Sequence, residues 1–395
     1  LISKKIQRTI FGEKYSNIVF LAGAGASVVS KNQNYGKTVR MIADDIFNKL
    51  HDNEKLHTKE DLYTLEELAI KCKYNNGNIL VEEQTGSSGN SRLDDSFNLE
   101  NFLSTLFHYR PYMVNTGKKK FDRTVRKILQ LIKENTNYSY NKEVLKHGAL
   151  LKFLSDLSGK GNNKFSVVTT NYDVLFEEAA AEDNFVIFDG FNFTPTPKFD
   201  SNIFEWNLVR EIQNINTREV EYMEKAFNLV KIHGSLTWER QSNGDIVRKN
   251  KDSITDTDKM VMVFPSSDKF AQSYQEPYFD LFTKFQELIK RPNTLLISSG
   301  FSFADDHISK MITQALKNNS SLKLLVTDFN IDPNREWDEK SNNFKEIDQE
   351  NIKYNRNWSE LVHLMNDGYP ISFLKATMND DLVDYLSGRY LNGEN

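Results

Sequence analysis

Short apolar runs bounded by turn residues recur along this chain, and helical patterns lie between them. The first run, Ile18–Ala22, is too short for a helix and ends at Gly23, so it predicts a buried strand that enters a tight turn. The other runs of this kind are residues 165–169, 229–232, 260–264, 294–298 and 322–326. Apolar residues recur at helical spacing in residues 39–50, 62–72, 99–107, 121–132, 150–157, 174–180, 277–290 and 308–316. This alternation predicts an α/β protein built on a Rossmann-like parallel sheet with large, mostly helical insertions.

The predicted sheet is interrupted by a long stretch that has no clear strand. We expect a Rossmann-like domain formed by residues 1–35 and 147–335, with a mostly helical insertion at residues 36–146 between its first two strands. Within this insertion, residues 75–96 are rich in Gly, Ser and Asn, which predicts a surface loop.

A second insertion is expected inside the Rossmann-like domain, at residues 184–227. It combines a loop around Pro195 and Pro197 with the apolar positions of Phe204–Ile212, which predict an amphipathic helix. Residues 336–395 are expected to form a C-terminal segment.

Composition narrows the class of protein. The chain has 395 residues, of which 39% are hydrophobic and 27% charged, and its net charge of −5 gives no overall attraction to nucleic acid or membrane. Its single cysteine, Cys72, excludes an internal disulfide and a cysteine-rich zinc site and fits a reducing compartment. The apolar stretch Val19–Val29 contains two glycines and follows Glu13, so it is not expected to be a signal peptide. We expect a cytoplasmic protein.

Small or polar residues follow five of the predicted strands. They read GAGAS at residues 23–27, TTNYD at 169–173, KIHGS at 231–235, GFSFADD at 300–306 and TD at 327–328. A parallel sheet places the carboxyl ends of its strands along one edge, where open α/β sheets bind ligands, so these segments are expected to meet at one crevice. Because Gly23 and Gly25 lack Cβ atoms, their backbone can approach a ligand closely and turn N–H groups toward an anion. A helix starting just afterwards would strengthen such a site.

The order and wording of these segments resemble the sirtuin superfamily, which has a GAG-x-S turn, a Thr-x-Asn-x-Asp box, a His-Gly pair, a glycine turn and a polar strand end. The chain lacks the four zinc-binding cysteines of sirtuin deacetylases, so a sirtuin-type sheet without a zinc ribbon is implied. It also reads KNQNYGKTVR at residues 31–40, where deacetylases have an Asp-Phe-Arg segment.

The chain is more similar to bacterial sirtuin-like proteins of antiphage defence, which hydrolyse NAD, and GFSFADDHI at residues 300–308 resembles their glycine turn. The resemblance implies an NAD+ glycohydrolase that depletes NAD in defence, with NAD as substrate. Such proteins are implied to be either fused to a sensor or paired with a partner such as a HerA-type ATPase, and the paired arrangement is expected here. The apolar faces of the helical insertion are a candidate site for homo-oligomer formation.

Two residues are expected to carry the chemistry. Breaking the bond between nicotinamide and ribose needs no acid for the leaving group, because nicotinamide leaves from a cationic ring, but it needs an oriented water or hydroxyl and a base. The Asn171 amide could orient the water or ribose, and the His233 imidazole, with an ordinary pKa of about 6.5, could accept the proton. Asn171 could instead cap the following helix, and His233 could be a hydrogen-bonding core residue.

The resemblance also implies which residues bind NAD. Asp173 would accept from the nicotinamide carboxamide, or could simply cap the helix that follows it; Gly25 and Ser27 would hold the diphosphate. The residues expected on the adenosine half are Gly300, Ser302 and, at its ribose, Asp328, which could instead be a turn residue. The binding set is completed by Gly23, Ala24 and Thr170.

Asp305 and Asp306 are interpreted as residues of a helix start and not as catalytic acids. The remaining histidines lack partners at metal-ligand spacing, so no metal is expected: His51, His57, His108, His147, His307 and His363.

Two alternative functions remain, and the first uses the same residues. A sirtuin-type NAD-dependent deacylase would require an acyl-lysine peptide for activity. A catalytically silent nucleotide-binding subunit would bind NAD and leave it unchanged.

Overall fold

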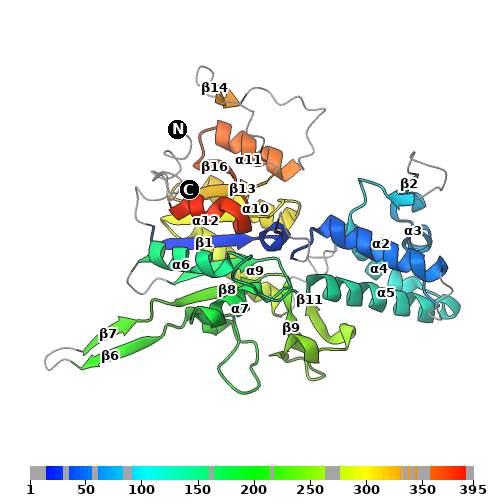
Figure 1. The fold of residues 1–395 in the computed structure, drawn as a ribbon, viewed down its shortest axis with the longest axis horizontal. Coiled ribbons are helices and arrows are strands. Elements are labelled where there is room, and N and C mark those ends of the chain that lie inside the picture. The colour runs from blue at the N-terminus through cyan, green and yellow to red at the C-terminus, as the bar shows by residue number, and fades with distance from the viewer. Residues whose placement is uncertain are drawn as a thin grey trace.

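The computed structural model describes residues 15–29, 35–55, 61–82, 91–159, 164–213, 218–262, 276–329, 331, 337–338, 343–344 and 356–387. Among these residues, seven parallel strands form a central sheet in the order β16-β13-β12-β1-β4-β8-β5 (Figure 1). Their bounds are β1 Asn17–Ala22, β4 Phe165–Thr169, β5 Val186–Phe188, β8 Ala226–Lys231, β12 Thr294–Ser299, β13 Lys323–Asp328 and β16 Ile371–Lys375. The predicted α/β class with a Rossmann-like parallel sheet is confirmed.

Both faces of the sheet are covered by helices. Successive residues of a strand point to opposite faces, and in β1 Val19 and Leu21 join one apolar cluster while Ile18 and Phe20 join another. The first cluster includes side chains of α9 (Tyr278–Lys290), α10 (Asp306–Asn318) and α11 (Arg356–Asn366), and the second those of α6 (His147–Ser158), α7 (Leu175–Glu182) and α12 (Val383–Ser387). Burial on both faces explains why the strands read as continuous apolar runs.

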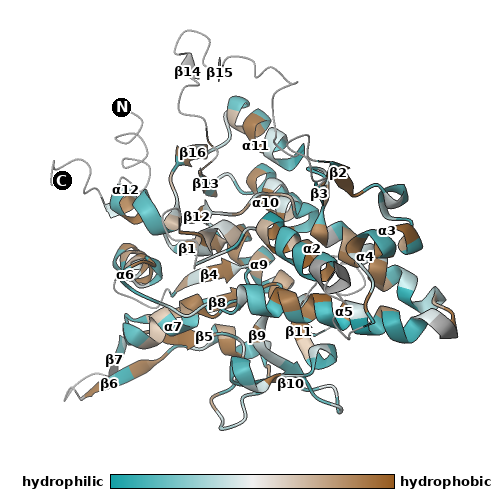
Figure 2. Ribbon diagram, turned by 45° about the vertical axis from the view of Figure 1, so that its right-hand side comes forward, coloured by the Kyte–Doolittle hydropathy of each residue, from teal (hydrophilic) through white to brown (hydrophobic). Residues whose placement is uncertain are grey.

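The helices predicted after the first strand extend to one side of the sheet (Figure 1). They are α2 (Val39–Lys55), α3 (Leu65–Cys72), α4 (Leu99–Tyr109) and α5 (Asn115–Thr136). Their buried side chains form a separate apolar cluster that also takes in Leu236 and Met262, and brown apolar stretches alternate with teal polar ones along α4 and α5 (Figure 2). The range 75–96, predicted to be a loop, contains a small antiparallel ladder of β2 (Leu80–Glu82) and β3 (Ser91–Leu93).

The helix predicted at Phe204–Ile212 is wrong. A 3-10 turn covers Ser201–Glu205, and β6 (Val209–Gln213) pairs with β7 (Arg218–Tyr222) in an antiparallel hairpin that projects from the body of the molecule (Figure 1). The range 184–227 also contains β5, a strand of the central sheet. The domain boundaries stay a prediction.

Another predicted strand lies outside the central sheet. β11 (Met260–Met262) pairs with β9 (Gly234–Arg240), which also pairs with β10 (Ile246–Arg248). Residues 263 and 264 of the predicted strand lie outside the described residues. The C-terminal range contributes β16 to the edge of the central sheet, and a short π-helical turn, Met378–Leu382, follows it.

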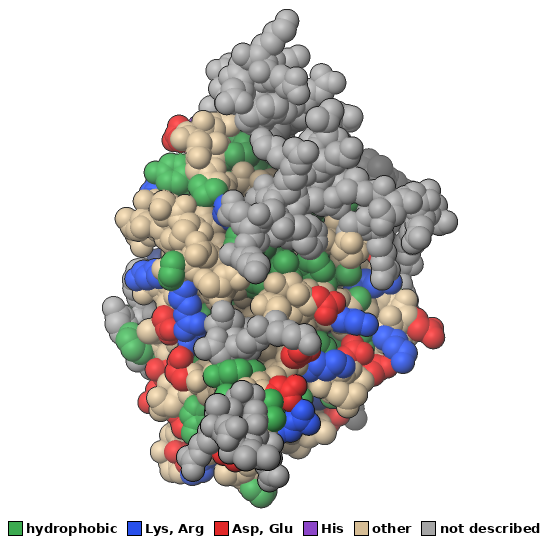
Figure 3. Space-filling model, turned by 90° about the vertical axis from the view of Figure 1, so that its left-hand side faces the viewer, with side chains coloured by type: hydrophobic (Ala, Val, Ile, Leu, Met, Phe, Trp, Pro, Cys, Tyr) green, Lys and Arg blue, Asp and Glu red, His purple; other side chains and the backbone are tan. Residues whose placement is uncertain are grey.

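The face drawn in Figure 3 has no large patch of one charge among the described residues. On the face drawn in Figure 3, basic and acidic side chains are interspersed among the described residues. None of the helices in the described part of the chain has the length and apolar character needed to cross a bilayer.

Candidate functional site

A crevice is expected where the direction of the sheet's connections reverses. From β1 the chain continues to β4 on one side, whereas from β12, the other neighbour of β1, it continues to β13 on the opposite side. The turns that follow β1 and β12 therefore leave in opposite directions, which opens a ligand-binding space between them. These two turns are the glycine segments that begin at Gly23 and Gly300.

The two glycine turns interlock through their backbones. The Gly23 N–H donates to the Ser299 carbonyl at 3.1 Å, and the Gly25 N–H donates to the Gly300 carbonyl at 2.9 Å. Gly300 has φ +61°, and a Cβ there would lie 2.2 Å from the Ala26 nitrogen. Glycine is therefore required at residue 300 for the two turns to approach this closely. The N–H groups of Gly23 and Gly25, however, were expected to face an anion and instead bond carbonyls of the other turn.

The helix expected just after the first glycine turn is only a short 3-10 turn. Ala24–Ser27 form a single 3-10 turn, and the next α-helix, α2, begins only at Val39. A helix dipole close behind the glycine turn is therefore absent among residues 24–29, and an anion held there would depend on side chains and individual amides.

A cavity of about 360 Å³ lies at this edge of the sheet, a volume that suits a small ligand. Every predicted site residue except Gly23 lines it. These are Ala24, Gly25, Ser27, Thr170, Asn171, Asp173, His233, Gly300, Ser302 and Asp328. Residues from all five predicted segments thus line one cavity, and His233 is the lining residue of the KIHGS segment. The role of each residue stays a prediction.

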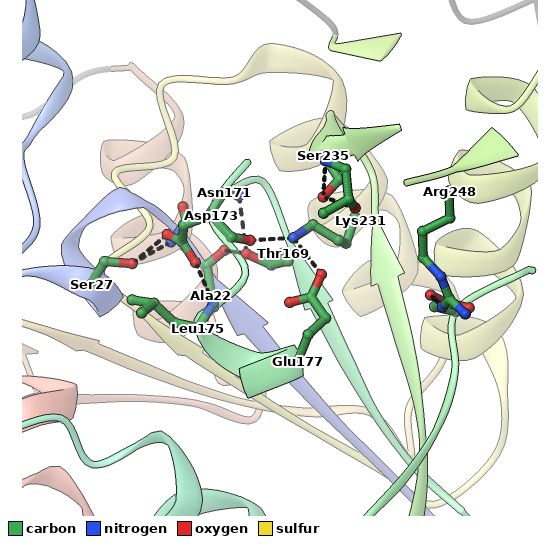
Figure 4. Close-up of polar contacts among 12 residues, drawn as sticks. Ala22, Ser27, Thr169, Asn171, Asp173, Leu175, Glu177, Lys231, Ser235 and Arg248 are labelled. Carbon is green, nitrogen blue, oxygen red and sulfur yellow. Dashed lines mark hydrogen bonds and ion pairs between the residues drawn. The ribbon is translucent and has the colours of Figure 1, made fainter. Parts of the chain in front are cut away.

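Asn171, Ser27 and Asp173 form one buried hydrogen-bonded chain (Figure 4). The Asn171 amide donates to the Ser27 hydroxyl at 3.0 Å, and this hydroxyl donates to Asp173 Oδ2 at 2.8 Å. Asp173 Oδ1 accepts from the Leu175 N–H at 3.2 Å, so the carboxylate also serves the start of α7. Burial raises the pKa of Asp173, while the nearby Lys231 ammonium opposes this increase. These hydrogen bonds fix the orientation of the Asn171 side chain.

Lys231 contacts the backbone of Asp173 and was not predicted as a site residue. Its side chain is 1% exposed, and its ammonium donates to the Asp173 carbonyl and lies 2.9 Å from Glu177 Oε1 (Figure 4). A buried cation needs such partners. The sequence contained a signal, because a lysine is rarely buried, and here it directly follows the apolar pair Leu229 and Val230 at the end of β8.

His233 lies against Asp305. His233 Nε2 is 3.2 Å from Asp305 Oδ2, and both side chains are 6% exposed. Asp305 Oδ1 accepts from the N–H groups of His307 and Ile308 at 3.0 and 3.3 Å, which confirms the interpretation of Asp305 as a helix-start residue. Its contact with the imidazole was not predicted, because it joins segments distant in sequence.

Two further segments line the cavity, and no sequence motif predicted their contribution. The helical insertion contributes Lys37, Arg40 and Tyr138, and the C-terminal range contributes Thr377 and Met378. The Arg40 guanidinium is held by the carbonyls of residues 93 and 94, each at 2.7 Å. Next to Met378, the Asn379 amide donates to the carbonyls of residues 26 and 28, each at 2.9 Å, and so fixes the glycine turn from outside.

Among the described residues, no group of three or more His, Cys, Asp or Glu side chains is arranged to hold a metal ion. The absence of a metal from the chemistry therefore stays an expectation.

Comparison with known proteins found one matching family model. Residues 166–354, just under half of the chain, are similar to the SIR2-like domain. The match includes Asn171, His233, Gly300 and Asp328 but begins after the glycine turn of β1. No curated protein matches the chain.

Two solved structures are similar at low scores. A sirtuin studied for the structural basis of substrate affinity is 13% identical, with 92% of this chain and 98% of that chain covered and a TM-score of 0.29. Cytosolic 5′-nucleotidase IIIB bound to cytidine is 10% identical, with 100% and 93% covered and a TM-score of 0.31. At these scores, the fold assignment rests on the strand order described above.

Proposed function

From the NAD-related activity that a SIR2-like domain implies, we propose that this chain is an NAD+ glycohydrolase, which cleaves NAD+ to nicotinamide and ADP-ribose. One observation supports the proposal above all: Asn171 and His233 follow the neighbouring strands β4 and β8 and line the same cavity as the two glycine turns. An amide and an imidazole are thereby within one space large enough for a small ligand.

The residues have separate tasks in the proposed reaction. Loss of nicotinamide gives an oxocarbenium-like ribose, and water must attack it with loss of a proton. The Asn171 amide, held by Ser27, would orient the water or the ribose, and His233 would accept the proton. Asp173 would accept from the nicotinamide carboxamide. Gly300, Ser302 and Asp328 would contact the adenosine half.

The biological setting is proposed from the resemblance of the sequence motifs to defence sirtuins. We propose that the chain depletes NAD in bacterial antiphage defence, in the cytoplasm, as a homo-oligomer with a HerA-type ATPase partner. An enzyme that destroys NAD must be restrained in the uninfected cell, so the activity is expected to depend on that partner.

The test is nicotinamide release from NAD+, measured by chromatography with and without the ATPase partner. Asn171→Ala and His233→Ala are expected to lower the rate by about 100-fold or more, because a positioned base alone contributes about 10²–10⁴. Asn318→Ala and His363→Ala, on exposed positions of α10 and α11, are the matched controls and keep the wild-type rate. Circular dichroism and Tm establish that all four variants are folded.

Two results would replace the proposal by an alternative. Release that strictly requires an acyl-lysine peptide would identify a deacylase. NAD+ that binds and stays intact, even with the partner and trigger present, would identify a silent nucleotide-binding subunit.

A further inference from the structure

The contact between His233 and Asp305 bears on which imidazole nitrogen acts as the base. Nε2 of His233 is fully buried, 3.2 Å from Asp305 Oδ2, and makes no aligned hydrogen bond with the described residues. A carboxylate at this distance favours a proton on the facing nitrogen. Hydrogen bonds of catalytic groups are often long or misaligned before substrate binds, so the present angle does not weaken the pairing.

We propose that Asp305 is a positioning residue that holds the proton of His233 on Nε2 and leaves Nδ1 as the basic nitrogen. This inference rests on the proposed function. During the reaction Nδ1 would take a proton from the attacking water, and the resulting imidazolium would be stabilised by the Asp305 carboxylate. Nε2 is buried against Asp305, and His233 lines the cavity, so we assign the contact with substrate or water to Nδ1.

Asp305 is well suited to this task because it is itself held in place. Its Oδ1 accepts two N–H groups at the start of α10, which leaves Oδ2 directed to His233. The side chain is 6% exposed, so water competes little for the carboxylate. One carboxylate thus fixes the helix and the imidazole together.

Other ionisable groups share the cavity with this pair. The ionisable residues that line it besides His233 and Asp305 are Lys37, Arg40, Tyr138, Tyr172, Asp173 and Asp328. A substitution of Asp305 leaves all of these groups in place and removes the carboxylate that lies against the His233 ring. A change confined to Asp305 therefore reports on this pair.

Asp305→Asn is the decisive variant. The Asn side-chain oxygen can still accept the two N–H groups at the helix start, so the cap is kept, but the amide donates to Nε2 and shifts the ring proton to Nδ1. We expect kcat for nicotinamide release to fall by about 100-fold, within the range for a lost general base, with little change in KM. Asp305→Ser keeps a cap and has no group to force the wrong tautomer, so its kcat is expected to lie between those of the wild type and Asp305→Asn.

Asp306→Asn is the matched control, because Asp306 is the neighbouring residue, its side chain is 66% exposed and it accepts from the Asn357 amide. Its kcat and KM are expected to stay at the wild-type values.

A second readout does not require activity. Nitrogen-15 shifts of the imidazole rings, assigned by comparison with His233→Gln, are expected to show protonated Nε2 in the wild type and protonated Nδ1 in Asp305→Asn. Protonated Nδ1 in the wild type, or kcat and tautomer both unchanged in Asp305→Asn, would overturn the inference. If no form of the protein releases nicotinamide, the glycohydrolase proposal fails, and the tautomer measurement still decides the role of Asp305.

Discussion

Ser27 shows how one hydroxyl can connect two site residues. It accepts from the Asn171 amide and donates to the Asp173 carboxylate, and all three side chains are buried. Ser27→Ala leaves both partners short of a hydrogen bond, which costs about 1–3 kcal/mol of unfolding free energy. It also releases the Asn171 amide, so nicotinamide release is expected to fall. Urea unfolding and the chromatographic assay measure the two effects.

A second serine provides the control for this variant. Ser298, in β12, has a buried hydroxyl without a hydrogen-bond partner in the described part of the chain. Ser298→Ala removes a desolvated polar group that gains nothing in return, so the free energy of unfolding is expected to stay equal or rise. Equal losses in Ser27→Ala and Ser298→Ala would show that the buried chain from Asn171 to Asp173 contributes nothing.

Single residues at strand ends were the most predictable part of the site. Asn171, Asp173 and His233 directly follow apolar strands, and a parallel sheet gathers such positions on one edge. The contact of His233 with Asp305 could not be predicted in this way, because residues 72 positions apart meet only after α10 has packed on the sheet. Asp305 also had a sufficient local explanation as a helix cap, which concealed its second contact.

At the scale of elements, the failed helix at Phe204–Ile212 has a clear origin. Apolar residues four positions apart, such as Phe204, Leu208 and Ile212, share a face in a helix, but they also share a face in a strand, where the period is two. The β-branched Val209 and Ile212 favour the strand. The central strands were unambiguous because their apolar runs were continuous and ended at glycine or polar residues.

The close contact between the turns after β1 and β12 leads to a prediction about Gly300. Its φ is +61°, and a Cβ added there would lie 2.2 Å from the Ala26 nitrogen, so any side chain displaces the glycine turn. Gly300→Ala is expected to cost about 1–2 kcal/mol for the left-handed backbone and about 1–3 kcal/mol more for the overlap. Nicotinamide release is expected to fall with it.

Gly368 separates the two contributions. It also has a positive φ, of +90°, but a Cβ there would meet nothing within 4 Å. Gly368→Ala is therefore expected to show only the backbone cost and to keep its activity. Chemical denaturation of both variants gives the comparison, and a Gly300→Ala variant as stable and active as Gly368→Ala would contradict the interlocked arrangement.

At the scale of the whole molecule, the cavity is assembled from parts that are far apart in the sequence. The helical insertion supplies Lys37 and Tyr138, and the C-terminal range supplies Thr377 and Met378. Sequence patterns predicted the existence of the insertion and most of its helices, but its position over the strand ends depends on tertiary packing. The C-terminal contribution lacked a signal in the sequence; in the fold, the buried Asn379 amide bonds the carbonyls of residues 26 and 28 at the glycine turn.

The stability of the whole molecule is expected to depend on pH through His147. This residue begins α6, its ring lies 4.8 Å from that of Phe176, neither ring nitrogen has a partner among the described residues, and burial lowers its pKa to about 3. The unfolded chain has a histidine pKa of about 6.5, so between these values the unfolded state binds one more proton and stability falls as pH decreases. In His147→Phe this titrating group is absent.

Relative to that variant, the wild type is expected to lose about 2 kcal/mol of unfolding free energy between pH 7 and pH 5. Urea unfolding at the two pH values measures this difference, in which groups common to both proteins cancel, and a difference that does not vary with pH would show that His147 is protonated equally in the folded and unfolded states.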